Sequence, residues 1–152
     1  MMTSSVNPRD WYANIWGKRI NDDDLMFELM SLQVFQAGLK WHSILNKRDA
    51  FKVAFEGWNI NRVAGFKEHD VIRLLSDNSI IRNRRKIEAC VFNALVIRTI
   101  KNKHGSFCHW FYEILEGETL EVLQKKLRPL FRFMGPEIAR MWLLAVGKID
   151  NG

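Results

Sequence analysis

Residues 130–147 read LFRFMGPEIARMWLLAVG, and this stretch contains the turn between two predicted helices. Upstream of it, Thr119 can cap a short helix. Within it, Gly135 precedes Pro136, and the fixed φ of proline suits the first position of a helix. Gly147 is a typical residue for ending that second helix. The sequence therefore predicts two short helices joined by an apolar hairpin turn near the carboxyl end of the chain.

The remainder of the chain also has helical periodicity. Asn21 can cap a long helix that ends at Gly38, and a second helix is predicted from about His42 to Glu56. A further helix is predicted to carry Val71, Ile72, Leu74 and Leu75. Two more sets of apolar residues mark helix faces: Ile87, Val91, Ala94 and Ile97; and Phe107, Trp110, Phe111 and Ile114. No stretch alternates apolar and polar residues as a half-buried strand does. We therefore predict an all-α fold.

Length and composition predict one domain over residues 1–152. The first seven residues, MMTSSVN, are polar, and we expect them to be disordered. They lack the features of a signal peptide, and no apolar run is long enough to cross a bilayer. Cys90 and Cys108 form no CxxC pair, so we expect free thiols. These features predict a cytoplasmic protein without membrane association, which we expect to be a monomer.

Positive charge is unevenly distributed along the chain. The net charge is +6 and the isoelectric point is about 9.5. Seven basic residues face one acid, Glu88, between residues 82 and 103: Arg82, Arg84, Arg85, Lys86, Arg98, Lys101 and Lys103. A second basic cluster comprises Lys125, Lys126, Arg128 and Arg132. This segregation favours a polyanionic partner, nucleic acid first, although a solvated basic face without a ligand has the same composition.

Gln33 is a polar residue on an apolar helix face. Leu25, Met26, Leu29 and Met30 recur at the three-and-four spacing of a buried stripe, and the same phase continues onto Gln33. A buried amide usually finds a backbone partner, so a satisfied core side chain is one interpretation. The other is that Gln33 points into a pocket.

Four segments together resemble one enzyme family. FMGPEIA (133–139) resembles the turn of a helix-hairpin-helix, which presents backbone amides to a DNA phosphate. WYANIWG (11–17), QAGLKW (36–41) and DVIRLLSDNSIIRNRRKIEACVFNA (70–94) are similar to segments of the 3-methyladenine DNA glycosylase I family. The resemblance covers about residues 11–149 and implies a compact helical domain of the helix-hairpin-helix DNA glycosylase type.

The resemblance also implies an activity and a set of site residues. Members flip an alkylated purine of the 3-methyladenine class out of double-stranded DNA and hydrolyse its N-glycosidic bond, which starts base excision repair. In this chain Gln33 falls at the base-recognising catalytic position, and Trp11, Trp16 and Trp41 would wall the base pocket. The resemblance and the basic clusters together assign DNA contacts to Gly38, Leu39, Arg82, Arg84, Arg85, Lys86, Arg132, Met134 and Gly135.

Three departures from the family pattern bear on function. At Gln33 the family carries a glutamate, and a neutral amide cannot offset the charge of a cationic base. At Tyr12 the family has a zinc-ligand histidine, and the other zinc ligands have no counterpart up to Gly152, so we expect no metal and no cofactor. The alternatives are a DNA-binding descendant without catalysis, or a glycosylase of altered specificity. Glu137 and Asp150 are weak candidates for a replacement catalytic acid.

Overall fold

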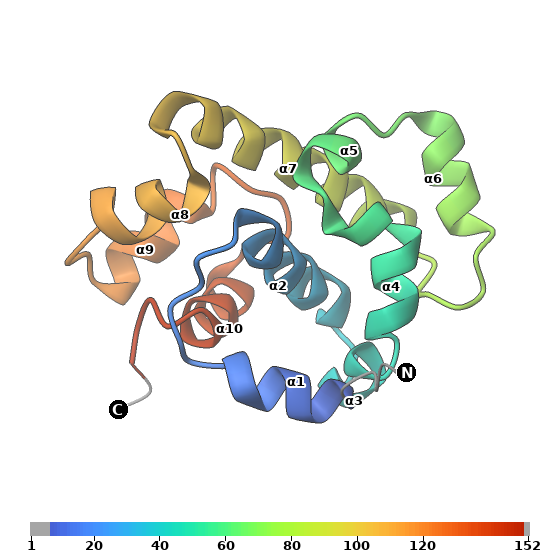
Figure 1. Cartoon of the computed structure of the whole chain (residues 1–152), viewed down its shortest axis with the longest axis horizontal. Coiled ribbons are helices and arrows are strands. Elements are labelled where there is room, and N and C mark those ends of the chain that lie inside the picture. Colours follow the sequence, from blue (N-terminus) through green and yellow to red (C-terminus); the bar gives the residue numbers. More distant parts are fainter. Residues whose placement is uncertain (1–6, 151–152) are drawn as a thin grey trace, which may run out of the picture.

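The computed structural model describes residues 7–150. This part of the chain consists of helices and the loops that connect them, without a strand (Figure 1). The predicted all-α fold is therefore confirmed. Its elements, in chain order, are α1 (Pro8–Ile15), α2 (Asp23–Gln36), α3 (Trp41–Leu45), α4 (Arg48–Ala54), the 3-10 turn η1 (Glu56–Trp58), α5 (Ile60–Ala64), α6 (Glu68–Leu75), α7 (Arg84–His104), α8 (Phe107–His109), the π-helical turn η2 (Trp110–Ile114), α9 (Leu120–Leu127) and α10 (Pro136–Ala145).

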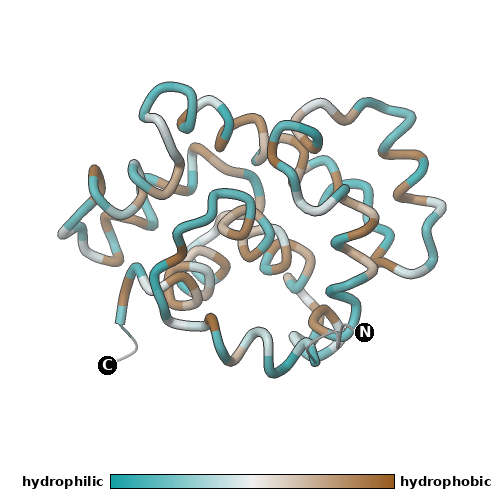
Figure 2. The backbone as a smooth tube through the Cα atoms, in the orientation of Figure 1, coloured by the Kyte–Doolittle hydropathy of each residue, from teal (hydrophilic) through white to brown (hydrophobic). Residues whose placement is uncertain are grey.

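Helix α2 is the central element of the fold. All of its residues from Met26 to Phe35 are buried, and the helix contacts α3, α5, α7, α8 and α10 (Figure 1). A helix that is covered on all sides needs an almost continuous apolar sequence, which these residues supply. Hydrophobic positions concentrate on the inner elements, while the outer loops are hydrophilic (Figure 2). The cap differs from the prediction, because the Asp22 carboxylate, rather than Asn21, accepts from the N–H groups of Asp24 and Leu25.

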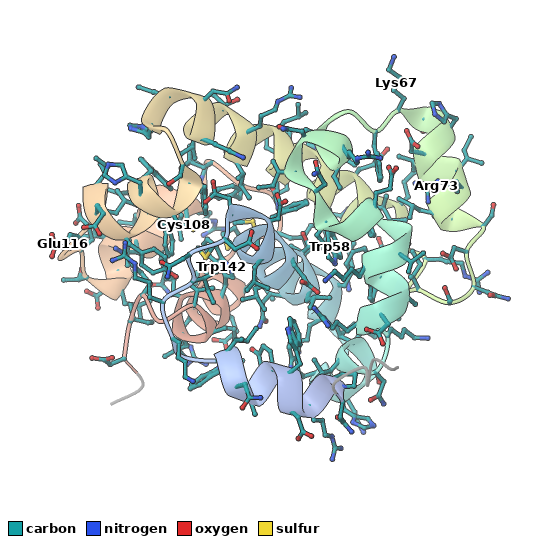
Figure 3. The ribbon with its side chains drawn as sticks, viewed as in Figure 1. Trp58, Lys67, Arg73, Cys108, Glu116 and Trp142 are labelled. Carbon is teal, nitrogen blue, oxygen red and sulfur yellow. The ribbon has the colours of Figure 1, made fainter. Side chains whose placement is uncertain are left out.

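Aromatic packing fills the core on both sides of α2. The rings of Phe55 and Trp58 are stacked with centroids 4.3 Å apart, and Phe27 meets Trp58 edge to face at 5.5 Å. On the other side Phe111 packs against Trp142 at 4.9 Å. Figure 3 shows Trp58 and Trp142 within the fold, while Lys67 and Glu116 lie at its periphery.

Two sequence predictions about helices are wrong in detail. The helix expected from His42 to Glu56 is interrupted at Asn46 and Lys47, which gives α3 and α4. The buried Ile44 and Phe51 are seven residues apart, a spacing that one uninterrupted helix would also have, so periodicity did not detect the break. The predicted apolar stripe near η2 is also incomplete, because Ile114 is 53% exposed.

The amino-terminal prediction concerns residues 1–7, of which residues 1–6 lie outside the described residues. Asn7 is ordered, contrary to the prediction, because its side chain caps α1 by accepting from the N–H of Arg9 at 2.8 Å. Cys90 and Cys108 are buried free thiols. Over residues 7–150, no helix combines the length and apolar character needed to cross a membrane.

A buried tyrosine joins the segment after α1 to the end of α10. The Tyr112 hydroxyl accepts from the N–H of Ile20 at 3.0 Å and donates to the carbonyl of Val146 at 2.6 Å. Nearby, the Gly17 N–H donates to the Ala145 carbonyl at 2.8 Å. These bonds hold the α1–α2 connection against α10. They therefore also fix the carboxyl end of α1, which leads into that connection.

We expect Tyr112→Phe to lower the free energy of unfolding by about 1–3 kcal/mol, because it leaves a buried N–H without its acceptor. Tyr12→Phe is the comparison variant, since Tyr12 is the other tyrosine of the chain and its hydroxyl interacts with the side chains of Gln33 and Trp16 rather than bridging two backbone groups. Urea unfolding of both variants measures the difference. Equal stability losses would show that the Tyr112 bridge contributes nothing of its own.

Candidate functional site

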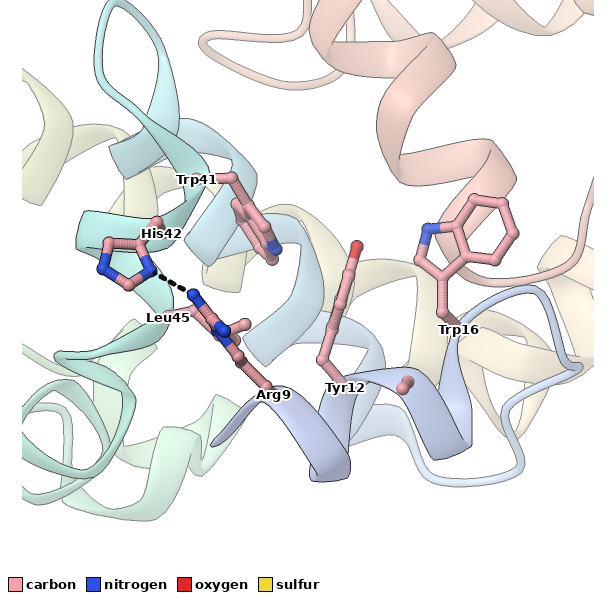
Figure 4. Close-up of a pocket in the computed structure, with 7 residues that line it drawn as sticks. Arg9, Tyr12, Trp16, Trp41, His42 and Leu45 are labelled. Carbon is pink, nitrogen blue, oxygen red and sulfur yellow. Dashed lines mark hydrogen bonds between the residues drawn. The ribbon is translucent and has the colours of Figure 1, made fainter. Parts of the chain in front are cut away.

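An open cavity of about 530 Å³ lies between α1 and α3 (Figure 4). Helix α1 and its carboxyl cap supply one wall, and α3 supplies the opposite wall. The lining residues are Arg9, Tyr12, Ala13, Trp16, Trp41, His42 and Leu45. The cavity is therefore mainly aromatic and apolar, with its polar groups contributed by few side chains, as in sites that bind small organic ligands.

Three aromatic rings shape this cavity. Tyr12 and Trp41 pack together with centroids 4.9 Å apart and planes tilted by 50°. Trp16 lies on the other side of Tyr12 and is 37% exposed (Figure 4). The indole Nε1 of Trp41 is buried and has no hydrogen-bond partner within residues 7–150. The arrangement offers flat π surfaces to a ligand.

Gln33 lies behind Tyr12 rather than in the lining of the cavity. It is only 1% exposed, and its Oε1 has no hydrogen-bond partner among the described residues. Burial raises the pKa of the Tyr12 hydroxyl to about 12, while interactions with the side chains of Gln33 and Trp16 act in the opposite direction. Gln33 is thus a core residue, as one interpretation proposed, but an unsatisfied one that adjoins a cavity-lining side chain.

Trp11 does not line the cavity, contrary to the prediction. The Arg48 guanidinium lies over its indole ring, 3.6 Å from the centroid, and the Arg48 Nε donates to Glu28 Oε2 at 3.0 Å. On a helix, Trp11 is rotated by roughly 140° from Trp16, whereas Tyr12 is rotated by only about 40°. This geometry explains why Tyr12, and not Trp11, shares the cavity face. The i, i+4 spacing of Tyr12 and Trp16 was the signal in the sequence that could have identified it.

The α1 helix carries three of the lining side chains, although none of its own residues is fully buried. Sequence reasoning missed four of the lining residues besides Tyr12: Arg9, Ala13, His42 and Leu45. Arg9 could have been found by continuing the same helix face backward, because it lies three residues before Tyr12. The other three gave no signal that distinguishes a cavity wall from an ordinary helix surface.

Gly38 and Leu39 form an exposed loop directly before Trp41. Gly38 has a φ of +80°, a left-handed conformation that favours glycine, and Leu39 is 40% exposed. The Gln36 side chain donates to the Leu39 carbonyl at 2.8 Å and so fixes the turn. An apolar side chain is thereby presented to solvent beside the cavity.

Lys86 is not a surface cation, contrary to the prediction. It is 6% exposed, and its Nζ donates to the carbonyls of Phe35 at 2.9 Å and Ala37 at 2.6 Å. A cation is favourable at the carboxyl end of a helix, where backbone carbonyls lack partners. Burial lowers the pKa of Lys86. Its function in the fold is to fix the end of α2 just before the Gly38–Leu39 loop.

The predicted arginines at the start of α7 are exposed, but they are not equivalent. Arg84 pairs with Glu68 at 2.8 Å and with Glu88 at 3.3 Å, so its charge is compensated locally. Arg82 and Arg85 are exposed, and the Arg85 guanidinium lies 5.6 Å from the centroid of the Phe133 ring. Arg85 therefore lies beside the hairpin turn.

The hairpin between α9 and α10 brings a second basic side chain to the same place. Arg132 is exposed, and with Arg85, Glu88 and Phe133 it lines a depression of about 400 Å³. Buried Asn93 holds the turn by donating to the Arg132 carbonyl at 3.1 Å and accepting from its N–H at 2.8 Å. The structure thus unites the two basic segments of the sequence.

Two further hairpin residues were predicted to contact DNA. Met134 is 2% exposed and belongs to the core, so its side chain is unavailable, contrary to the prediction. An apolar residue in a turn of this kind is needed to anchor the turn to the helices below. Gly135 precedes α10 as its cap without a side-chain hydrogen bond, which leaves the first N–H groups of α10 without a capping side chain.

The remaining candidates concern acid catalysis and metal binding. The Arg140 guanidinium, 2.7 Å from Glu137, holds the pKa of that exposed carboxyl below its usual value, so Glu137 is a poor proton donor. Asp150 is exposed. Residues 7–150 contain no group of three or more His, Cys, Asp or Glu side chains placed to bind a metal ion. Tyr12 itself faces the cavity, so the described residues do not fit a zinc site there; the absence of zinc stays a prediction.

Comparisons with known proteins agree with this architecture. DNA-3-methyladenine glycosylase of Haemophilus influenzae is 34% identical over 93% of this chain and 86% of its own length. DNA-3-methyladenine glycosylase 1 of Escherichia coli is 28% identical over 93% of this chain and 85% of its own length. Among solved structures, 3-methyladenine DNA glycosylase I of Staphylococcus aureus superposes with a TM-score of 0.85, at 28% identity, over 98% of this chain and 89% of that one.

A second solved structure carries a ligand. It is a Tyr-to-Phe variant of 3-methyladenine DNA glycosylase I in complex with 3-methyladenine, and it superposes with a TM-score of 0.86, at 28% identity, over 98% of this chain and 90% of that one. The sequence profile described as methyladenine glycosylase matches residues 2–130, which is most of the chain. The helical fold, the relatives and the profile agree, and the chain therefore belongs to the methyladenine glycosylase family.

Proposed function

We propose that this protein is a monofunctional DNA glycosylase that extrudes an alkylated purine from duplex DNA and hydrolyses its N-glycosidic bond. Membership of the family supports the reaction class, as do the names of the relatives. The observation that carries the proposal is the cavity of Tyr12, Trp16 and Trp41 with the unsatisfied Gln33 Oε1 behind it.

Stacking provides the main binding energy in this proposal. Removing a nucleotide from the duplex costs a few kcal/mol, whereas stacking of a base on an aromatic side chain contributes about 1–3 kcal/mol. The extruded purine lies against Trp41 and Tyr12, and the exposed Leu39 enters the gap that it leaves in the duplex. Arg85, Arg132 and the free amides of α10 bind the phosphate backbone nearby.

The lining of the cavity also limits the chemistry. None of its seven residues is a carboxylate, and the Tyr12 hydroxyl, with a pKa of about 12, is neutral and a poor acid at pH 7. The lining therefore offers neither an anion to stabilise positive charge nor a carboxylic acid to protonate the base. A purine that is already cationic by alkylation needs neither, because its glycosidic bond is weakened before binding, and positioning suffices. This supports a base of the 3-methyladenine class as the substrate.

In this arrangement Gln33 reads the base through Tyr12. Its amide can accept from or donate to the Tyr12 hydroxyl, but it provides neutral bonds only. A charge-assisted hydrogen bond is roughly twice as strong as a neutral one. The chain is therefore expected to recognise a cationic base less strongly than a relative with a carboxylate at this position.

Release of 3-methyladenine from alkylated duplex DNA by the purified protein tests the proposal, with two variants at Gln33. Gln33→Glu should raise kcat/KM roughly tenfold, which corresponds to replacing a neutral hydrogen bond by a charge-assisted one. Gln33→Leu, of similar volume, should lower kcat/KM, since it removes both polar groups.

Each other outcome has a defined meaning. Wild type could bind DNA in a salt-dependent manner and release no base, while Gln33→Glu releases base. This result would favour a DNA-binding descendant that has lost catalysis. Release of a different base by wild type would favour altered specificity. Unchanged activity in Gln33→Leu would mean that Gln33 only fills the core.

A further inference from the structure

Arg9 lies at the mouth of the cavity, across from α3. Its side chain extends from the first turn of α1 toward His42 on the opposite wall, and Nη2 lies 3.2 Å from His42 Nδ1 (Figure 4). Because a guanidinium only donates, Nδ1 of His42 must be the acceptor of this bond. The Asn46 side-chain amide lies 3.0 Å from the other ring nitrogen, Nε2. Because Nδ1 accepts, Nε2 carries the ring proton and donates, so the amide is oriented with its oxygen toward the ring. The guanidinium is thus held in place at the opening by a neutral partner.

The charge of Arg9 is not compensated locally, unlike that of several other arginines. Within residues 7–150, the arginines of the ion pairs are Arg19, Arg48, Arg62, Arg73, Arg84 and Arg140, and Arg9 is not among them. Arg9 is also the only Lys, Arg, Asp or Glu among the residues that line the cavity. A cation at the entrance is unfavourable for a cationic base by itself, so its partner must be an anion that arrives with that base.

We propose that Arg9 binds a phosphate group of the extruded nucleotide and that His42 holds the guanidinium at the mouth until the nucleotide arrives. This inference rests on the proposed function. A nucleotide that turns out of the duplex brings its sugar and flanking phosphate to the cavity entrance, where Arg9 is the one Lys, Arg, Asp or Glu among the described lining residues. Arginine matches phosphate with two parallel hydrogen bonds, which the single contact to His42 leaves largely available.

Such a contact discriminates between extruded and stacked nucleotides. The arginines at the hairpin can meet backbone phosphates of any duplex, because those phosphates lie on its outside. Arg9 meets a phosphate only when a nucleotide has entered the cavity. Its contribution should therefore be confined to DNA that contains a lesion, whereas an ordinary surface cation contributes equally to both kinds of duplex.

Equilibrium binding to two duplexes of the same sequence tests this, one undamaged and one with a tetrahydrofuran abasic-site analogue. Arg9→Gln should weaken binding to the abasic duplex about tenfold, as expected for one lost charged hydrogen bond. The slope of log K against log salt for that duplex should fall by about one. Arg62→Gln is the matched control, because Arg62 is exposed, pairs only with Glu56 at 3.4 Å and lies on α5. His42→Ala should weaken binding less than Arg9→Gln.

The outcomes separate this inference from the function on which it rests. If wild type prefers the abasic duplex but Arg9→Gln behaves as Arg62→Gln does on both duplexes, Arg9 binds no phosphate and the inference alone is overturned. If wild type binds both duplexes equally, the proposed function and the inference are overturned together. A circular-dichroism spectrum unchanged from wild type establishes that the exposed substitution leaves the fold intact.

Discussion

Replacing Trp41 with alanine is expected to lower kcat/KM for release of 3-methyladenine from alkylated DNA by about 10–100-fold. This range follows from the loss of one base-stacking surface, which contributes about 1–3 kcal/mol. Trp41 packs against Tyr12 with centroids 4.9 Å apart, so the substitution also removes the support of the second ring. The measurement is single-turnover base release under enzyme excess, which separates the chemical step from product release.

Two control variants distinguish stacking from general damage to the fold. Trp41→Phe keeps a π surface and should recover most of the activity. Trp110→Ala removes an indole that packs against Phe107 and His104, away from the cavity, and should leave base release per folded molecule unchanged. If Trp41→Ala retained full activity, the cavity between α1 and α3 would not be the base pocket.

Arg48→Met is expected to lower the free energy of unfolding by about 3–5 kcal/mol at pH 7, because it leaves the Glu28 carboxylate buried without its partner. The Glu28 side chain is 4% exposed and that of Arg48 is 14% exposed. Substitution also removes the guanidinium that covers Trp11, so α1 loses a contact. Urea unfolding monitored by circular dichroism measures the loss.

The pH dependence gives this prediction a specific sign. Burial raises the pKa of Glu28 in the native protein, and the hydrogen bond and charge of Arg48 only partly oppose it. A carboxyl whose pKa is higher in the folded than in the unfolded state destabilises the fold fully above its folded pKa, and this cost shrinks as the pH falls from the folded pKa toward the unfolded pKa, below which it is gone. Without Arg48 the folded pKa rises further. The stability deficit of Arg48→Met should therefore be largest at neutral pH and shrink toward acidic pH.

A double variant and a surface control complete this experiment. Glu28→Gln combined with Arg48→Met removes the unpaired charge and should recover much of the stability. Arg62→Met breaks the exposed pair with Glu56 and should cost no more than about 1 kcal/mol. A deficit in Arg48→Met that does not change with pH would exclude the stranded carboxylate as its cause.

The sequence predicted most of the fold because strong local signals determine it. Pro136 is at the first position of α10 as predicted, and Thr119 caps α9. The apolar stripe from Leu25 to Met30 predicted the long helix α2, but its central position became visible only in the structure. The break at Asn46 and Lys47 was missed because the buried Ile44 and Phe51 keep a helical spacing across it.

The candidate site was less predictable. Whether a residue lines the cavity depends on the rotation of its helix about the helix axis and on how deeply its side chain is buried. Trp41 and Trp16 line the cavity, but Trp11, which the resemblance assigned to it, lies on another face of α1 than Tyr12. Lys86 and Met134 were assigned to a DNA surface from charge and from position in a motif. Neither composition nor spacing reveals that a lysine bends inward to helix carbonyls, or that a turn residue anchors the core. Such assignments require three-dimensional contacts.

The loose attachment of α1 has a thermodynamic consequence. Half of the cavity wall belongs to a helix without a single fully buried residue, docked by side chains of Arg9, Trp11 and Tyr12. Segments with so little burial open locally at a small free-energy cost, well below that of global unfolding. Docking of α1 and formation of the cavity are then one equilibrium, and any ligand that binds between α1 and α3 shifts it toward the docked state. The apparent affinity of the cavity is set partly by the fraction of molecules in which α1 is docked, so mutations remote from the ligand can tune it.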